Sequence, residues 1–225
     1  HMDRAVALQP DDMGAQMYRA SLLYRLGRLD DAIVGYTRVL EKADDALKLR
    51  AYIERGLAKE QKQDFVSAAD DYTAALMIEK GSVSALSRRG DCLERMGKHE
   101  EAIADFTHLL EIVPAEQTSL IYFNRARSYR ALGQLDEAVA DYTHALEHTS
   151  DVLPIYIERS ISYRLMDRNE EALLDVERAL AIDPKNADLL NLRAIEKIKL
   201  NDIHGALADL NAAITLDAAN AAFFA

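Results

Sequence analysis

The sequence predicts an all-α fold that repeats a pair of helices, and three observations predict it. A 14-residue pattern returns six times along the 225 residues. Its apolar positions recur every three and four residues, which is the spacing of a helix buried along one side. The chain also has only 9 Gly and 4 Pro, too few for the many turns of an all-β sandwich.

The copies of this pattern set the length of each unit. They begin 36, 34, 36, 34 and 34 residues apart, at Gly27, Gln63, Gly97, Gly133, Asp167 and Asn201. The stretches before the copies, such as YRASLLYRL before Gly27 and NRARSYRAL before Gly133, show the same helical spacing. Each unit is therefore expected to contain two helices, and a fixed period of this size is typical of repeat architectures.

The residue at each junction predicts a tight turn between the two helices. Five of the six are Gly, Asp or Asn, which tolerate the left-handed conformation that ends a helix, and Gln63 is the exception. Acidic residues follow at the start of the second helix, where the positive helix end stabilises negative charge. They are Asp30, Asp31, Glu100, Glu101, Asp136, Glu137, Glu170 and Glu171.

Several positions taken together resemble the tetratricopeptide repeat, a helix-turn-helix unit of 34 residues. The small residue of the first helix is Ala20, Gly56, Gly90, Ala126, Ser160 or Ala194. One position of the second helix is alanine in all six copies: Ala32, Ala68, Ala102, Ala138, Ala172 and Ala206. Its large slot holds Tyr36, Tyr72, Phe106, Tyr142, Val176 and Leu210, and Pro114 and Pro184 match the family's terminal proline.

The resemblance implies a right-handed α-solenoid of six repeats, at residues 13–48, 49–82, 83–118, 119–152, 153–186 and 187–220. Residues 1–12 are expected to hold a tag remnant and the end of a preceding repeat, and residues 221–225 to begin a seventh. The two 36-residue spacings predict longer loops at residues 44–48 and 114–119. Because solenoid ends need polar caps and neither end has one, we expect end-to-end association with another copy.

Composition and motifs argue against several classes of function. The chain has 27 Lys and Arg against 38 Asp and Glu, a net charge of −11, which disfavours nucleic acid and anionic membranes as ligands. No apolar run approaches the ~20 residues of a membrane span. The single cysteine favours a reducing compartment, with the cytoplasm as the default expectation. Without a glycine-rich phosphate loop or a patterned catalytic set, we predict no enzyme and no cofactor.

Two features of metal or thiol chemistry have simpler interpretations. His144 and His148 are expected one turn apart on a second helix, a geometry that two metal ligands could use. No third ligand accompanies them, so a solvated helix face is favoured and no metal site is predicted. Cys92 follows Gly90 by two residues, and we expect it to be a small buried residue, not a reactive thiol.

Opposite charges recur at matched positions of the repeats. Arginine occupies one slot of every first helix, at Arg19, Arg55, Arg89, Arg125, Arg159 and Arg193. Aspartate precedes the large slot of five second helices, at Asp71, Asp105, Asp141, Asp175 and Asp209, with Gly35 as the exception. The arginines could bind anions, but we favour a structural ladder in which each arginine pairs with an aspartate of a neighbouring helix.

The resemblance also implies that the first helices line a concave groove. The residues that match its groove positions carry eight positive and six negative charges, so the acidity of the chain lies elsewhere. The residues predicted to bind a peptide are Tyr24, Arg88, Asn124, Arg127, Arg130 and Arg164. Alternatively, Asp91, Glu94 and Glu158 neutralise these arginines locally. The family's two-carboxylate clamp and its asparagine ladder are both absent, because Asn124 is the only asparagine at the ladder position.

These observations predict a protein-interaction scaffold that binds a peptide or helix of another protein. Rigid stacked helices offer a groove in which a partner segment is desolvated with little reordering of the host. Two alternatives stay open. In the first, the array is the substrate-recognising or regulatory part of a larger enzyme. In the second, it is a self-assembly module.

Overall fold

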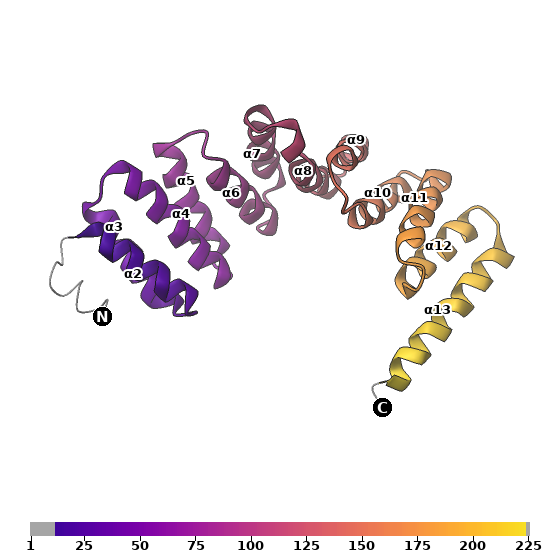
Figure 1. The fold of residues 1–225 in the computed structure, drawn as a ribbon. Coiled ribbons are helices and arrows are strands. Elements are labelled where there is room, and N and C mark those ends of the chain that lie inside the picture. The colour runs from indigo at the N-terminus through magenta and orange to yellow at the C-terminus, as the bar shows by residue number, and fades with distance from the viewer. Residues whose placement is uncertain (1–11, 224–225) are drawn as a thin grey trace. The chain divides into compact units, whose positions relative to one another are not determined.

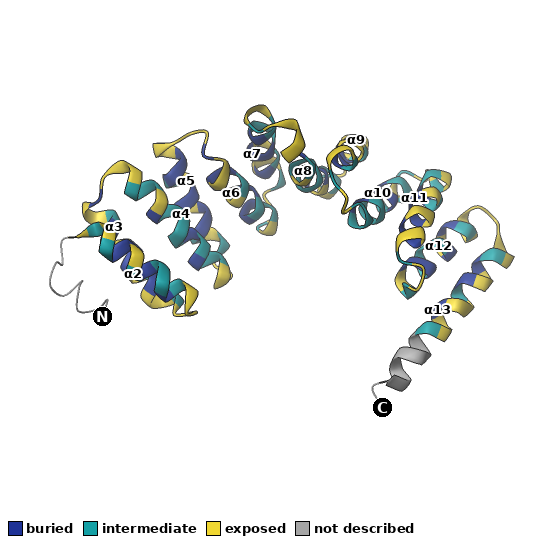
Figure 2. Ribbon diagram, viewed as in Figure 1, coloured by how far each residue is buried: buried dark blue, intermediate teal, exposed yellow. Residues whose placement is uncertain are grey.

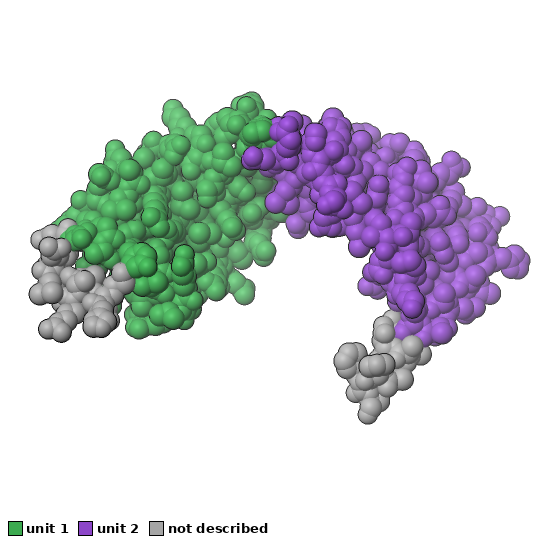
Figure 3. Space-filling model, in the orientation of Figure 1, with its two compact units in different colours: residues 1–114 green, residues 115–225 purple. Residues whose placement is uncertain are grey.

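The computed structural model describes residues 12–223, with side chains up to residue 216. Over this range the chain forms twelve α-helices and two 3-10 helices and contains no strand. It divides into two compact units, one ending at Pro114 and the other starting at Ala115 (Figure 3). Each unit contains three helix pairs and is described by itself.

Unit 1 contains six helices, in which each first helix packs against the second helix of its own pair and of the pair before (Figure 1). They are α2 (Met13–Arg25), α3 (Leu29–Lys42), α4 (Asp45–Gln61), α5 (Phe65–Ile78), α6 (Val83–Arg95) and α7 (His99–Ile112). We call the side formed by α2, α4 and α6 the first-helix face of unit 1, and the side formed by α3, α5 and α7 its second-helix face.

Unit 2 repeats this arrangement. Its elements are η1 (Ala115–Gln117), α8 (Ser119–Ala131), α9 (Leu135–Ala145), η2 (Leu146–His148), α10 (Leu153–Leu165), α11 (Asn169–Ile182), α12 (Ala187–Lys199) and α13 (Ile203–Phe223). Its first-helix face is formed by α8, α10 and α12. Helix α13 continues across residue 220, where a seventh repeat was expected to begin, and the expectation for residues 1–11 lies outside the described part of the chain.

The core of each pair is a large side chain of the second helix held against a small residue of the first. Tyr36, Tyr72, Phe106 and Tyr142 are all fully buried. Figure 2 shows how buried and exposed residues alternate along the helices. A Cβ atom added to Gly56 would lie 2.6 Å from Cε1 of Tyr72, so the ring lies directly on the glycine backbone. Burying a large apolar side chain stabilises a fold by roughly 1.5–3 kcal/mol, which explains why this pairing recurs.

The turn between the helices of each pair is the same in all six copies. The six junction residues have φ between +55° and +75°, with Gln63 at +63°. The next amide donates back to the carbonyl five residues earlier, as from Lys98 to Leu93 at 2.8 Å. This is the Schellman ending of a helix. Gln63 therefore adopts the left-handed conformation although its side chain disfavours it.

One of the two predicted long loops is wrong and the other is confirmed. Residues 44–48 form no long loop, because Asp44 accepts a bond from the amide of Leu47 at 2.9 Å and caps α4, which begins at Asp45. The extra residues thus lengthen the helix to 17 residues. The second connection runs from α7 to α8 and includes the 3-10 helix η1.

Candidate binding surface

Five of the six arginines of the predicted ladder bind an aspartate of the second helix in their own pair. Arg159 donates from Nε and Nη2 to the two carboxylate oxygens of Asp175, at 2.7 and 2.9 Å. The same two-point contact joins the arginines and aspartates of four other pairs: Arg55 with Asp71, Arg89 with Asp105, Arg125 with Asp141, and Arg193 with Asp209. Arg19, whose partner position is Gly35, has no such aspartate.

A third bond from the same arginines joins neighbouring repeats. Nη1 of Arg159 donates to Oγ1 of Thr143 at 2.9 Å, and Thr143 belongs to the second helix of the preceding pair. Arg55 and Arg89 reach Thr37 and Thr73 in the same way, at 2.9 and 3.1 Å. The pattern of charges in the sequence did not predict this contact. Its signal was a threonine directly after the large residue in four copies, at Thr37, Thr73, Thr107 and Thr143.

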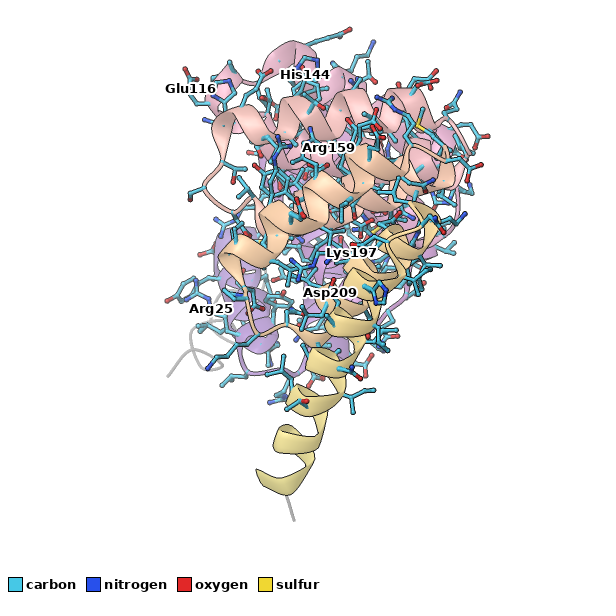
Figure 4. The ribbon with its side chains drawn as sticks, turned by 90° about the vertical axis from the view of Figure 1, so that its right-hand side faces the viewer. Arg25, Glu116, His144, Arg159, Lys197 and Asp209 are labelled. Carbon is cyan, nitrogen blue, oxygen red and sulfur yellow. The ribbon has the colours of Figure 1, made fainter. Side chains whose placement is uncertain are left out.

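Aromatic rings and lysines complete the surroundings of the arginines. The guanidinium carbon of Arg159 lies 5.9 and 5.8 Å from the ring centres of Tyr156 and Tyr163, within the range of a cation–π contact. Where lysine replaces the second tyrosine, Lys59 and Lys197 instead pair with the ladder aspartates, at 2.7 and 2.8 Å. Figure 4 shows Lys197 and Asp209 together between α12 and α13.

The ladder aspartate of the last repeat, Asp209, is held as a carboxylate. Burial alone would raise the pKa of Asp209, but hydrogen bonds from Arg193 and Lys197 outweigh it and lower the pKa below its ordinary value. In unit 2 the side chain of Arg159 is 8% exposed and that of Asp175 is 1% exposed. Each of the three guanidinium nitrogens of Arg159 already donates one internal hydrogen bond, so an incoming anion would compete with an internal contact.

The predicted groove residues fall into two groups, one in each unit. Unit 1 contains Tyr24, which is half-buried and packs against the core of α2 to α4, and Arg88, which lies 3.5 Å from Glu60. Unit 2 contains Asn124, half-buried on α8, and Arg127, exposed on the same helix.

The other two predicted groove arginines contact glutamates of the following repeat. Nη2 of Arg130 lies 2.6 Å from Oε2 of Glu158, and Nη1 of Arg164 lies 3.9 Å from Oε1 of Glu196. Glu158 was foreseen as a local neutralising group, whereas Glu60 and Glu196 were not. By solvent exposure, Arg127 is the exposed arginine of the set in unit 2, and Arg130 and Arg164 are half-buried.

The hydroxyls of two buried tyrosines of the second helices in unit 1 donate hydrogen bonds to glutamates of the first helix α4. The hydroxyl of Tyr36 donates to Oε2 of Glu54 at 2.8 Å, and Arg50 donates to the other oxygen of Glu54, also at 2.8 Å. The hydroxyl of Tyr72 donates to Glu60 at 3.0 Å. Burial raises the pKa of both hydroxyls well above the ordinary value. The acids are thereby drawn inward, which the sequence pattern did not predict.

The features considered for metal or thiol chemistry are placed as follows. Cys92 is buried, as predicted, and its Sγ lies 3.4 Å from Glu60; burial raises its pKa. The expectation that His144 and His148 share a helix is wrong, because α9 ends at Ala145 and His148 lies in η2. His144 stacks on Tyr122 and contacts Glu147 at 3.2 Å. In the described part of the chain, no group of three or more His, Cys, Asp and Glu could hold a metal ion.

The fold defined by these contacts is all-α, and each unit is a stack of helix-turn-helix repeats like those of tetratricopeptide repeat solenoids. Two family models described as tetratricopeptide repeats match the chain, one at residues 1–48 and the other at residues 82–151, and together they cover about half of it. The chain therefore belongs to the tetratricopeptide repeat (TPR) family. None of its described helices is both long and apolar enough to cross a membrane.

Individual relatives share parts of the sequence or the fold. Sperm-associated antigen 1 of Mus musculus is 33% identical over 88 residues, which cover 39% of this chain and 9% of that protein. The C-terminal part of a TPR protein from Cytophaga hutchinsonii has a TM-score of 0.81 and 17% identity, over 96% of this chain and 88% of that one. YrrB, described as a TPR protein with an unusual peptide-binding site, has a TM-score of 0.73 and 20% identity, over 84% and 96% of the two chains.

The likenesses to solved structures show the fold. The curated relatives are much longer proteins, because the matched stretches span only 9 to 12% of their length.

Proposed function

We propose that this chain is a protein-interaction scaffold that holds a peptide or helix of another protein on its first-helix faces. The observation that carries the proposal is the internal ladder. Its arginines are engaged in ion pairs between the helices, and these pairs hold the first helices rigidly in place. Side chains such as Arg127 then project from a preorganised surface, and a rigid host loses little entropy on binding. YrrB, a protein of the same fold, is described as having a peptide-binding site, which supports this function.

Within this function, the groove residues are Tyr24 and Arg88 in unit 1 and Asn124, Arg127, Arg130 and Arg164 in unit 2. Arginines bind carboxylates in a two-point geometry, and asparagine can bind an extended peptide backbone through both donor and acceptor. Because Arg88, Arg130 and Arg164 already contact glutamates, an acidic partner would compete with an internal carboxylate. This competition favours a partner with several acids over one with a single acid.

The test is a double charge reversal, Arg127→Glu with Arg130→Glu, in the full chain. Partners recovered from a lysate would be compared quantitatively with those of wild type. The matched control is Lys185→Glu with Arg38→Glu, which makes the same change in net charge at exposed residues outside the groove. We expect the groove variant alone to lose acidic partners by about tenfold or more. Equal recovery of all partners by both variants would remove the assignment.

A self-assembly module is the second candidate function, and one surface of unit 2 favours it. Leu207 and Ile214 of α13 are 56% and 66% exposed. Their counterparts in the earlier copies, such as Leu173 and Leu180, are half-buried or buried beside the next repeat. Exposed apolar side chains at such positions match the way one repeat packs on another. A second copy of the chain is the proposed occupant.

Light scattering after size exclusion tests this second candidate. We expect wild type to show a mass that rises with concentration, and Leu207→Lys with Ile214→Lys to remain monomeric. A wild-type monomer at high concentration would contradict it. Neither candidate assigns a chemical reaction to this chain. If the chain is instead the substrate-recognising or regulatory part of a larger enzyme, another domain would have to supply the catalytic groups.

A further inference from the structure

A pocket opens between two second helices of unit 1, away from the first-helix face. It has a volume of about 340 Å³. Helices α5 and α7 supply its walls and α6 supplies its floor. Its apolar surface comes from Val66 and Ala69 of α5, Leu93 of α6, Met96 directly after α6, and Ala104 of α7. A volume of this size lies at the lower end of the range of ligand-binding clefts.

Comparison among the six copies explains why the pocket lies here. The residue after the buried alanine of each second helix is a large aliphatic in every other copy: Ile33, Ile103, Val139, Leu173 and Leu207. In the second copy it is Ala69, which is several carbons smaller. Ala69 leaves open the space that its counterparts would fill, so the pocket is a local departure from the repeat pattern.

Two further departures from the pattern lie on the same turn of α5. Val66 stands where most other copies have an acid and is 58% exposed. Asp70 is the only charged residue at its position, which holds Val34, Ala104, Ala140, Leu174 and Ala208 elsewhere. All three unusual residues line this one pocket. Val66 replaces the usual acid of the wall by an apolar side chain, Ala69 leaves space beside it, and Asp70 places a carboxylate at the rim of the pocket.

The charges around the pocket leave Asp70 unbalanced. Arg89 is engaged by Asp105 and Thr73, and Lys98 lies 3.1 Å from Glu101. Among the described residues, the carboxylate of Asp70 makes no side-chain hydrogen bond and no ion pair. The rim therefore offers one free negative charge beside an apolar hollow. The complementary ligand has an aliphatic group next to a positive charge.

We propose that this pocket binds a basic segment of a partner protein, with an aliphatic side chain in the hollow and a neighbouring lysine or arginine at Asp70. The residues that contribute most to binding cluster in well-packed, desolvated pockets, and a hollow lined by Val, Ala, Leu and Met matches an aliphatic side chain. The site is separate from the first-helix face and goes beyond the scaffold function proposed above. The chain would thus hold two segments at once, an acidic one on the first helices and a basic one between α5 and α7.

The copies themselves supply the variants that test this site. Ala69→Ile introduces the residue type of the other copies, so it fills the pocket with a side chain that the fold already accommodates. Asp70→Ala introduces the residue of the third, fourth and sixth copies and removes only the rim charge. Val66→Glu restores the usual acid of the wall without touching the core. Val139→Ile is the matched control, because it enlarges the same position in unit 2.

The probe is a library of random peptides displayed on phage, selected on the full chain and counter-selected on Ala69→Ile. We expect enriched peptides to carry Leu, Ile or Met beside Lys or Arg. In fluorescence anisotropy, their affinity should fall about tenfold or more with Ala69→Ile and with Val66→Glu, and stay unchanged with Val139→Ile. With Asp70→Ala the loss should be smaller, and the salt dependence of binding should weaken.

Three outcomes would overturn the proposal: no enriched peptide, peptides that bind Ala69→Ile as well as wild type, or pocket-dependent peptides that are acidic. Circular dichroism and thermal melting establish that Ala69→Ile is folded, and Val66→Glu tests the same wall if it is not. Peptides bound to the first-helix face would depend on Arg127 and Arg130 and not on Ala69. The failure of this site is therefore distinguishable from the failure of the groove.

Discussion

Single residues decide the turns and the charges of this protein. The clearest case is Gln63, which occupies a left-handed turn position with φ of +63°, where three other copies have glycine. A residue with a Cβ pays roughly 1 kcal/mol or more for this conformation, whereas glycine adopts it freely. The first helix of the second repeat thus ends in a left-handed turn although Gln63, the residue at this turn, disfavours the left-handed conformation.

Replacing Gln63 by glycine should therefore stabilise the protein. We expect Gln63→Gly to raise the free energy of unfolding by about 0.5–1 kcal/mol, measured by urea denaturation. The reciprocal variant, Gly97→Gln, should lower it by a similar amount, because Gly97 has φ of +74°. Equal stability of all three proteins would mean that the turn relaxes to another conformation.

A second prediction at this scale concerns Asp91 on α6. Burial raises its pKa to about 6, with Arg88 opposing the shift and Glu60 and Glu94 adding to it. A raised pKa in the folded state means that protonated Asp91 favours folding. This contribution is complete below about pH 4, the ordinary pKa of aspartate, and is lost as the pH rises through 6.

Asp91→Asn, which is neutral at every pH, should therefore be more stable than wild type at pH 7, and the difference should vanish below about pH 4. Urea unfolding at several pH values from 4 to 7 measures it. A variant that is less stable than wild type by the same amount throughout this range would show that the contacts of the carboxylate outweigh its burial.

At the scale of helices, the ladder adds directional hydrogen bonds between helices that the burial of apolar side chains holds together without a fixed direction. Each ladder arginine spans a first and a second helix, and Arg55, Arg89 and Arg159 also reach the preceding repeat through a threonine. The periodicity of arginine and aspartate predicted that opposite charges would meet. It did not reveal the threonine, because one hydroxyl per repeat gives no charge pattern.

Removing one partner of this contact should be costly. We expect Arg159→Met to lower the free energy of unfolding by about 3 kcal/mol, because it leaves Asp175 charged and buried. Asp175 also pairs with Arg178 at 2.9 Å. The double variant Arg159→Met with Asp175→Leu should recover most of the loss, since it removes the buried charge and the Arg178 side chain, which is 45% exposed, is solvated by water. A single variant as stable as wild type would show that the ladder is dispensable for folding and would revive the interpretation of Arg159 as an anion-binding residue.

Each of the two units is an array in which a repeat contacts its neighbours, so that stability is a sum of local terms. The effect of Arg159→Met should accordingly be concentrated in unit 2. Hydrogen exchange measured by mass spectrometry should show loss of protection in α10, α11 and their neighbours, with α2 to α5 unchanged. Uniform loss along the chain would indicate that the two units unfold together.

The sequence by itself determined the helix pairs, their turns, the buried large residues and the partners of the ladder, because each follows from a pattern repeated six times. Only the tertiary structure decided that Asp44 caps and lengthens α4, that buried tyrosines hold Glu54 and Glu60, and that Val66, Ala69 and Asp70 line one pocket. The physical reason is that repetition reports what all copies share. A departure in a single copy gains meaning only when its neighbours in space are known.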